Sequence, residues 1–305
     1  MQVTYGFDNS EFNDWLESKG FYIAYDSHSN YSKTTFSLPS SLNMDYFNPD
    51  WIKNDKREQE DKLVSLIVNN KVSHLLKSTG YHYVYVSSGS FHDEAKPYAE
   101  VYKSRTIVNN FTTFLLWNTA ASPLVERYVV DSQRDRVLFA FDTLVNLPEY
   151  NKPVFVFAHI LCPHSPTIFN EDGSVPSRIE RLEDNPEILR ASYPEQVKFT
   201  NTKTKELVEA LLEIEPEPII ILQGDHENGG DAIEPYLSGT GILNAYYLPD
   251  GGNKLLYESI SPVNSFRTIF NYYFNADYEI LEDKSYCVTD YPYVFFDTNE
   301  YGRCP

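Results

Sequence analysis

The chain has 305 residues, 42% of them hydrophobic, which is enough for one large α/β domain or two small ones. Its formal net charge of -19 argues against nucleic acid or an anionic membrane surface as a partner, because both require a basic protein surface. No uninterrupted apolar run is long enough to span a bilayer and no signal-peptide pattern opens the chain, so the chain as given is expected to be soluble.

Helices and strands alternate in the first half of the sequence. Short helices are predicted at 10–19 and 34–42, and strands at 21–25 and 81–86. The apolar spacing of four residues predicts one further helix that ends at Gly80; these residues are Leu63, Ile67, Val72 and Leu75. Residues 106–144 are predicted to be helical in two pieces broken near Pro123, within a helical cover at about 90–150.

The second half continues the alternation. Val154–Ala158 and Ile219–Leu222 are apolar runs typical of buried strands, and the second is of the kind found inside parallel sheets. Between them, a helix is predicted to turn Leu207, Leu211 and Ile214 inward. A further strand at 242–248 and a helix at 263–274, started by Pro262, complete the pattern. The sequence therefore predicts an α/β fold with a mostly parallel central sheet and helices on both faces, in a single domain over residues 1–305.

Asp225 and His226 follow Gly224 directly after the predicted strand Ile219–Leu222. In open α/β sheets, ligands bind beyond the carboxyl ends of the strands. One carboxylate and one imidazole suit a divalent metal ion, since they offer a hard oxygen and a borderline nitrogen. The alternative is an ordinary Asp-His pair in a surface loop, so the metal hypothesis depends on the other segments of the chain.

Two more segments carry candidate residues. Thr34 lies in the hydroxyl-rich run 32–40 at a predicted helix start, where the helix dipole favours an anion or a developing alkoxide; a helix cap is the commoner role for such a residue. His159 and His164 lie in a proline-stiffened loop directly after the strand Val154–Ala158. They are candidates to hold a metal ion or a phosphate oxygen, with packing and turn formation as the alternative.

Five motifs occur in the order used by one superfamily. They are Tyr5–Phe12 together with Asn30–Thr34, the loop His159–Pro166, the helix with Tyr193, Gln196 and Asn201, Gly224–His226, and Ser261–Arg267. Together they resemble the alkaline phosphatase/sulfatase superfamily, in the sulfatase-like branch that includes lipoteichoic acid synthases and phosphoethanolamine transferases. The resemblance covers nearly the whole chain and implies an alkaline phosphatase-like fold.

The resemblance also implies roles for individual residues. Thr34 matches the family's nucleophile, which also contacts the metal, in a Thr-x-x-Ser-x-Pro setting typical of the phosphoethanolamine transferases. Asp225 and His226 match two ligands of the catalytic divalent metal, expected to be Zn²⁺ or Mn²⁺, with Mg²⁺ or Ca²⁺ as alternatives. His159 and His164 match the histidine loop that contacts the transferred group or a second metal.

The nucleophile separates the chemistries that the resemblance allows. Sulfatases of this superfamily use a Cys or Ser within a Cys/Ser-x-Pro-x-Arg signature, and that signature is expected to be absent here. The sequence therefore predicts phosphoryl transfer or phosphoester hydrolysis through a covalent phospho-Thr34. Two alternatives remain open: a sulfuric ester hydrolase, and a truncated or degenerate member that binds a ligand or partner without catalysis. The expected substrate is a phosphoester or head group, from a membrane lipid or a cell-surface glycan; no nucleic acid and no protein partner is expected.

Three features depart from the family pattern or stay open. The chain begins where the family's first strand and its acidic metal ligand have already passed, so N-terminal truncation is expected, from a parent anchored on the extracytoplasmic face of a membrane. Glu227 stands where relatives more often have glycine. The three cysteines form no metal-ligand spacing, and the sequence leaves open a disulfide between Cys287 and Cys304.

Overall fold

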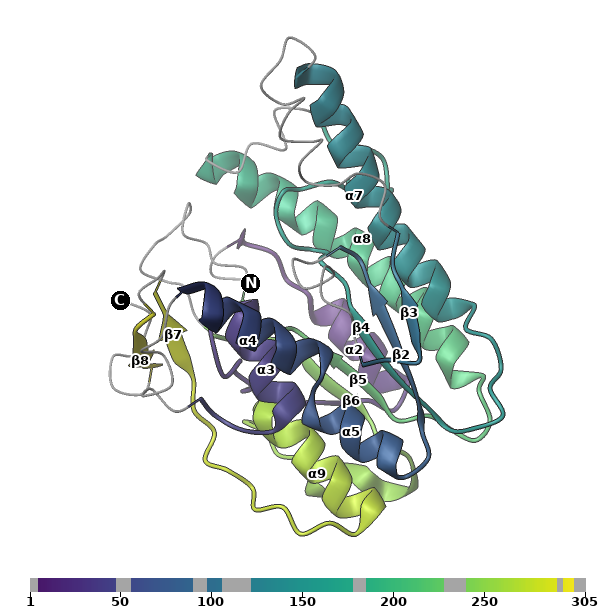
Figure 1. The fold of residues 1–305 in the computed structure, drawn as a ribbon. Coiled ribbons are helices and arrows are strands. Elements are labelled where there is room, and N and C mark those ends of the chain that lie inside the picture. The colour runs from purple at the N-terminus through teal and green to yellow at the C-terminus, as the bar shows by residue number, and fades with distance from the viewer. Residues whose placement is uncertain are drawn as a thin grey trace. The chain divides into compact units, whose positions relative to one another are not determined.

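The fold is described from a computed structural model, which is drawn in Figure 1. It describes residues 5–47, 56–89, 98–105, 122–177, 185–227, 240–289 and 293–298. The chain forms two compact units, one from residues 1–75 with 212–305 and the other from residues 76–211. Each unit is treated by itself below, and the single domain over residues 1–305 stays a prediction, as does the missing first strand.

The first unit contains a three-stranded sheet in the order β1-β6-β5. Its strands are β1 (Tyr22–Ile23), β6 (Asn244–Tyr247) and β5 (Ile220–Gln223). Both β1 and β5 pair with β6 in antiparallel orientation. The prediction that Ile219–Leu222 is a strand inside a parallel sheet is therefore wrong within the described residues. The predicted burial holds for Ile220, whereas Ile219 is 38% exposed. Aliphatic composition alone does not distinguish a parallel strand from an antiparallel one.

Helices pack around this sheet and around one another. Their bounds are α2 (Ser10–Ser18), α3 (Thr34–Asn43), α4 (Lys56–Val68), the 3-10 helix η3 (Pro249–Leu255) and α9 (Pro262–Phe274). Helix α3 contacts both α4 and α9, and Figure 1 shows it beside α9. Tyr246 of β6 and Ile269 of α9 are buried together in one core cluster, so α9 covers the sheet that carries β5.

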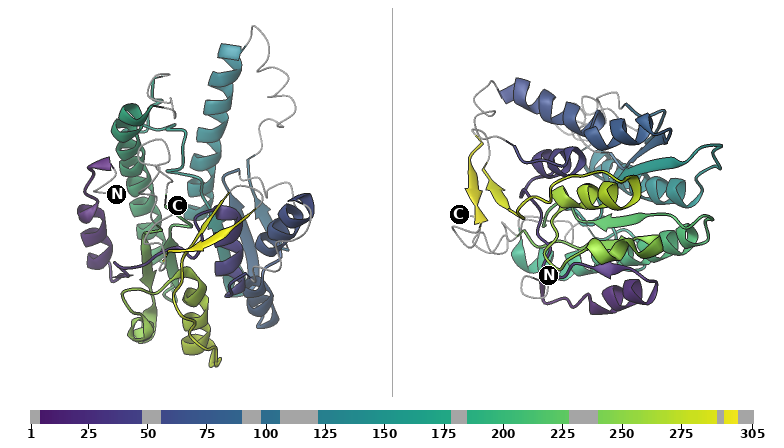
Figure 2. Two further views of the ribbon diagram at one scale, coloured as in Figure 1. Left: turned by 90° about the vertical axis from the view of Figure 1, so that its left-hand side faces the viewer. Right: turned by 90° about the horizontal axis from the view of Figure 1, so that it is seen from below.

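A two-stranded ribbon lies near the C-terminal end of the unit, drawn in yellow in Figure 2. It pairs β7 (Tyr286–Val288) with β8 (Phe295–Asp297) in antiparallel orientation. The outer edge of β7 also pairs with the segment before α3, since Ser32 N donates to Tyr286 O at 3.0 Å and Tyr286 N donates to Asn30 O at 2.9 Å. This pairing fixes the chain that leads into α3.

The helix expected from Leu63 to Gly80 is two helices, α4 and α5 (Lys71–Ser78). Asn70 separates them. Its side-chain oxygen accepts a 2.8 Å hydrogen bond from Ser73 N, which is an N-cap for α5, and its Nδ2 donates to Ile67 O at 2.8 Å. The apolar spacing continues through the break because both helices turn their apolar residues inward. The pattern of apolar residues therefore does not show where the first helix ends and the second begins.

The second unit contains a parallel sheet in the order β3-β2-β4. Its strands are β2 (His82–Ser87), β3 (Val101–Lys103) and β4 (Val154–His159), and its long helices are α7 (Ser122–Val145) and α8 (Pro186–Leu212). The parallel sheet predicted from sequence is confirmed here for the strands at 81–86 and 154–158. Of the two helical pieces expected over 106–144, the second is α7, and residues 106–121 lie outside the described residues.

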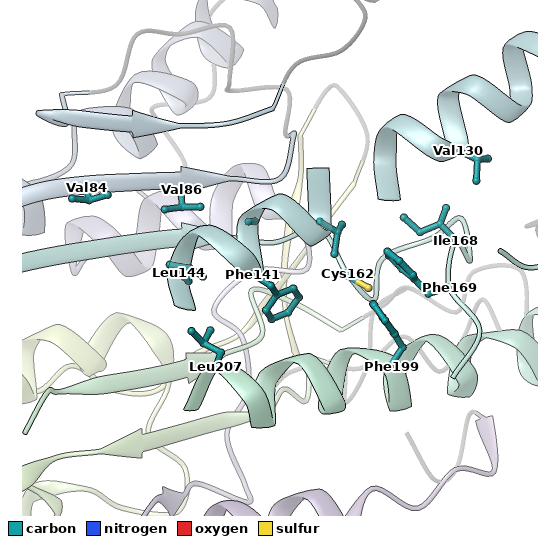
Figure 3. Close-up of a cluster of buried hydrophobic side chains, with 12 residues drawn as sticks. Val84, Val86, Val130, Phe141, Leu144, Cys162, Ile168, Phe169, Phe199 and Leu207 are labelled. Atoms are coloured by element: carbon teal, nitrogen blue, oxygen red, sulfur yellow. The ribbon is translucent and has the colours of Figure 1, made fainter. Parts of the chain in front are cut away.

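The core of this unit lies between one face of the sheet and the two long helices. Figure 3 shows Val84 and Val86 of β2 with Phe141 of α7 and Leu207 of α8 in one cluster. The inward orientation predicted for Leu207 and Leu211 is confirmed, since Leu211 packs against the same cluster. It is wrong for Ile214, which is 47% exposed because α8 ends at Leu212.

The cysteines differ in state. Cys287 of β7 is disulfide-bonded, and Cys304 lies outside the described residues. Cys162 is a free, buried thiol, and burial raises its pKa to about 12. A thiol that stays protonated at neutral pH is a poor nucleophile, so Cys162 is a packing residue.

Candidate functional site

Thr34 is the first residue of α3, and the preceding Lys33 has an extended backbone. The first turn is anchored by Phe36, which is buried in a cluster of aromatic side chains with Tyr31, at a ring centroid distance of 5.9 Å. Tyr31 belongs to the segment that pairs with β7, and burial raises the pKa of its hydroxyl. These contacts hold the N-terminal end of α3, and Thr34 with it, in one place.

Asp225 and His226 follow β5 and lie against Thr34. Thr34 Oγ1 donates to Asp225 Oδ2 at 2.6 Å and lies 3.0 Å from His226 Nε2. The same Nε2 lies 3.5 Å from Asp225 Oδ2, and the side chains of His226 and Asp225 are only 15% and 25% exposed. The structure therefore brings Thr34 against two residues that lie 191 and 192 positions further along the sequence; we call the three the Thr34–Asp225–His226 cluster.

The hydrogen bonds of His226 show why this cluster favours a positive charge. His226 Nδ1 lies 2.7 Å from the carbonyl oxygen of Glu227, and since a carbonyl only accepts, Nδ1 carries a proton. In the neutral ring, Nε2 then presents a lone pair to Thr34 Oγ1 and Asp225 Oδ2. The Thr34 hydroxyl has only one proton, and that proton is bonded to Asp225 Oδ2. The lone pair of His226 Nε2 therefore faces the oxygen atoms of Thr34 and Asp225 with no proton between them. A divalent cation bound between these atoms removes that repulsion.

The donor types fit a divalent metal ion. Asp225 supplies a carboxylate oxygen, His226 an imidazole nitrogen with its second nitrogen bonded to a backbone carbonyl, and Thr34 a hydroxyl. The described residues contain no group of three or more His, Cys, Asp or Glu side chains that could hold a metal ion. The cluster thus offers two side chains of a metal-binding type and one hydroxyl, and the backbone carbonyl of Glu227 contacts the second nitrogen of His226.

His159 and His164 lie in the second unit. His159 is the last residue of β4 and is buried, and its carbonyl oxygen accepts from Ser88 N at 3.1 Å. His164 is exposed, and its Nδ1 contacts the carbonyl oxygen of Ser165. The structure thus places both histidines at the carboxyl end of a parallel strand, as the sequence predicted. Their placement relative to the Thr34–Asp225–His226 cluster stays a prediction.

The chain is similar to known proteins in structure, and its sequence alone finds no match. No protein-family model and no curated protein sequence matches the chain. The C-terminal periplasmic domain of EcEptC from Escherichia coli matches with a TM-score of 0.55 and 11% identity, covering 98% of this chain and 88% of that one. The C-terminal periplasmic domain of the phosphoethanolamine transferase EptC from Campylobacter jejuni matches with a TM-score of 0.51 and 16% identity, covering 92% and 86%. The soluble domain of lipooligosaccharide phosphoethanolamine transferase A from Neisseria meningitidis matches with a TM-score of 0.51 and 14% identity, covering 85% of this chain and 79% of that one.

The chain has an alkaline phosphatase-like fold. The fold class expected from the sequence is thereby confirmed, and the resemblance drawn from its motifs is confirmed at the level of the fold. Within the described part of this alkaline phosphatase-like fold, none of the helices is both long and apolar enough to cross a membrane.

One string of residues has the letters of a sulfatase signature. Ser174-Val175-Pro176-Ser177-Arg178 reads Ser-x-Pro-x-Arg, although nothing at Thr34 does. In the structure Ser174 is exposed in a turn of the second unit, where its Oγ accepts from Asn170 Nδ2 at 2.9 Å, and Arg178 lies outside the described residues. Thr34, by contrast, lies at a helix N-terminus beside Asp225 and His226.

Two residues near the candidate sites were missed as site residues by the sequence reasoning. Ser37 donates from Oγ to the carbonyl oxygen of Asp225, and Gln196 of α8 holds the histidine loop. Gln196 is fully buried; its Oε1 accepts from the backbone N–H groups of Ile168 and Phe169, and its Nε2 donates to the carbonyls of Pro163 and His164. The spacing Thr34-x-x-Ser37 is the one sequence signal for the first of these, since it places both hydroxyls on one helix face.

Proposed function

We propose that this chain is the catalytic part of a metal-dependent phosphoryl-group transferase or phosphoesterase in which Thr34 is the nucleophile. The observation that carries the proposal is the position of Thr34 Oγ1, 2.6 Å from Asp225 Oδ2 and 3.0 Å from His226 Nε2 at the first residue of α3. A hydroxyl with two proton acceptors and a helix N-terminus beside it is set up to lose its proton.

The proposed reaction has two steps at Thr34. In the first, Thr34 Oγ bonds to phosphorus while the ester P–O bond breaks; the Thr34 proton passes by way of Asp225 Oδ2 to the departing alkoxide, which leaves as the alcohol. In the second, the hydroxyl of an acceptor molecule or of water takes the phosphoryl group and Thr34 regains a proton. A divalent cation held by Asp225, His226 and Thr34 would neutralise charge on the phosphoryl oxygens and lower the pKa of the Thr34 hydroxyl. Zn²⁺ or Mn²⁺ is the cation we propose, with Mg²⁺ or Ca²⁺ as the next candidates.

The structural neighbours support a transferase that acts outside the cytoplasm. Two of them are named as phosphoethanolamine transferases, and two are described as periplasmic domains. By analogy we propose a phosphoester head group as the donor, a membrane lipid or cell-surface glycan as the acceptor, and the extracytoplasmic face of the membrane as the place of action. We further propose that His159 and His164 contact the transferred group or a second metal ion.

Thr34 favours phosphate over sulfate esters as substrates. Sulfatases of this fold need a modified Cys or Ser at the nucleophile position, and this chain has a threonine there. The test is hydrolysis of an aryl phosphate and an aryl sulfate by the purified chain and by its Thr34→Ala and Thr35→Ala variants, each loaded with Zn²⁺ or Mn²⁺. Thr35 is the matched control, because it is the next residue of the same helix and also half-buried.

The proposal predicts turnover of the phosphate ester by the wild type and by Thr35→Ala, and its loss in Thr34→Ala. Phosphoesterase activity retained in Thr34→Ala would remove Thr34 as the nucleophile. Turnover of the sulfate ester alone would favour the sulfatase alternative, and a metal-loaded wild type inactive on both esters would favour a non-catalytic binding role.

A further inference from the structure

Three hydroxyl side chains form a row along one face of α3. Thr34, Ser37 and Ser41 are spaced i, i+3 and i+7, which places them on one side of a helix. All three reach the chain at the end of β5. Thr34 Oγ1 bonds to the Asp225 carboxylate, Ser37 Oγ to the Asp225 carbonyl oxygen, and Ser41 Oγ lies 3.4 Å from Gln223 Oε1. The helix that carries the nucleophile and the strand end that carries the metal ligands are therefore joined by side chains of α3.

The Ser37 contact has a special position in this row. The carbonyl oxygen of Asp225 belongs to the peptide group that links Asp225 to His226. A hydrogen bond to that oxygen fixes the plane of this peptide, and with it the directions in which both side chains leave the backbone. Further along, the carbonyl oxygen of Glu227 accepts from His226 Nδ1 at 2.7 Å. The peptide group before His226 is thus tied to Ser37, and the ring of His226 is held by the backbone of the next residue.

The surroundings of Ser37 give this contact strength. Ser37 is 1% exposed, so water does not compete for its hydroxyl. The β5–β6 backbone pairing reaches Gly224, whose N–H donates to Leu243 O at 2.9 Å, and the Ser37 contact follows at the next residue. At the other end of α3, Arg267 donates from Nε and Nη2 to Met44 O at 2.8 and 2.6 Å. Helix α3 is therefore held in place at its C-terminal end, and Ser37 on this helix holds the backbone at Asp225, just after β5.

We propose that Ser37 is a positioning residue for the Asp225–His226 pair: its hydroxyl orients the peptide between the two metal ligands. The inference rests on the proposed function, because it gives Asp225 and His226 the role of ligands. Residues that orient metal ligands change metal affinity when they are removed, typically by about 10- to 100-fold. A residue that serves only to hold a helix in place changes stability instead.

The test compares Ser37→Ala with Ser41→Ala in the whole chain. Ser41 is the matched control: it lies one turn further along the same face, is also buried, and contacts Gln223 and the carbonyl of Pro262 but neither ligand residue. Wild type, both variants and Asp225→Ala are titrated with Zn²⁺ in competition with a chromophoric chelator. The visible absorption of the Co²⁺-loaded proteins and their melting temperatures are recorded alongside.

We expect Ser37→Ala to bind Zn²⁺ at least about tenfold more weakly than wild type and to show an altered Co²⁺ spectrum. Ser41→Ala should keep the wild-type affinity and spectrum, although both variants lower the melting temperature by a few degrees. Ser37→Cys, which keeps the size of the side chain with a weaker donor, should bind with intermediate affinity.

The outcomes separate the two proposals. Wild-type affinity in Ser37→Ala, or an equal loss in Ser41→Ala, would overturn the role of Ser37 while Asp225→Ala still shows that the ligand is correct. A wild type that binds no Zn²⁺, or an Asp225→Ala variant that binds it as the wild type does, would overturn the metal site and the positioning role together.

Discussion

His226 Nδ1 and the carbonyl oxygen of Glu227 are 2.7 Å apart, and this contact decides which ring nitrogen of His226 faces Thr34 and Asp225. Because the carbonyl can only accept, Nδ1 holds a proton and Nε2 is the atom left for a metal ion or for the Thr34 hydroxyl. The side chain is thereby prepared as a ligand by the backbone of the next residue.

The first prediction concerns the proton on His226. In the metal-free protein, nitrogen NMR of the neutral imidazole ring should show a protonated Nδ1 and an unprotonated Nε2. On addition of Zn²⁺ the Nε2 signal should shift while Nδ1 keeps its proton. A ring protonated at Nε2 alone would contradict the contact with Glu227 and the site built on it.

The second prediction concerns the buried guanidinium of Arg267. It donates to the carbonyls of Met44 and Glu279, so Arg267→Met leaves both without a charged donor. We expect a loss of about 3 kcal/mol in the free energy of unfolding, measured with urea. The control is Arg127→Met, whose side chain is 84% exposed and lies 3.8 Å from the Asp131 carboxylate; it should change stability by less than about 0.5 kcal/mol. Equal effects of the two variants would show that Arg267 does not anchor α3.

The third prediction concerns Gln196, whose four hydrogen bonds all go to the backbone of the histidine loop. Gln196→Leu keeps the approximate volume and removes all four, so the amide protons of Ile168 and Phe169 should exchange much faster with solvent. Glu195→Gln, at a half-buried neighbouring position on α8 whose carboxylate pairs with Lys198, is the control and should leave both exchange rates unchanged. Slow exchange retained in Gln196→Leu would mean that other contacts hold the loop.

A fourth prediction follows from the pKa of Tyr46, which burial raises from 10.0 to about 12. Between these two values the folded protein keeps the Tyr46 proton while the unfolded chain loses it. The free energy of unfolding therefore falls as the pH rises from about 10 to about 12. Tyr46→Phe should be less stable than wild type at neutral pH, since the hydroxyl donates to Glu282 O at 2.9 Å, and its stability should fall less steeply across that range. If the free energy of unfolding fell as steeply with pH in Tyr46→Phe as in the wild type, the raised pKa of Tyr46 would be contradicted.

Local patterns in the sequence were sufficient for most single elements. The start of α3 at Thr34, the parallel strands β2 and β4 and the start of α9 at Pro262 are where hydroxyl, apolar and proline signals placed them. Pairing between distant segments was not predictable in this way. Two examples are the antiparallel pairing of β5 with β6 and the contact between Ser37 and Asp225. Both depend on which surfaces meet after folding, and the periodicity of apolar residues does not predict this.

The candidate site shows the same division. Thr34, Asp225 and His226 were identified by residue type and position at element ends, and the structure brings them within hydrogen-bond distance. The supporting residues were not identified, because a buried Ser or Gln that bonds to backbone looks in sequence like any other polar residue. Gln196 was noted as part of a motif, but its four backbone contacts are a property of the folded loop.

In the proposed reaction, Thr34 carries the phosphoryl group between donor and acceptor. The most direct measurement is acid quenching of the metal-loaded chain during turnover of an aryl phosphate, followed by proteolysis and mass spectrometry of the peptides. The account predicts a phosphoryl group on Thr34 in the wild type and none on the corresponding peptide of Thr34→Ala, which should also be inactive. A phosphorylated residue elsewhere, or turnover by Thr34→Ala at the wild-type rate, would contradict it.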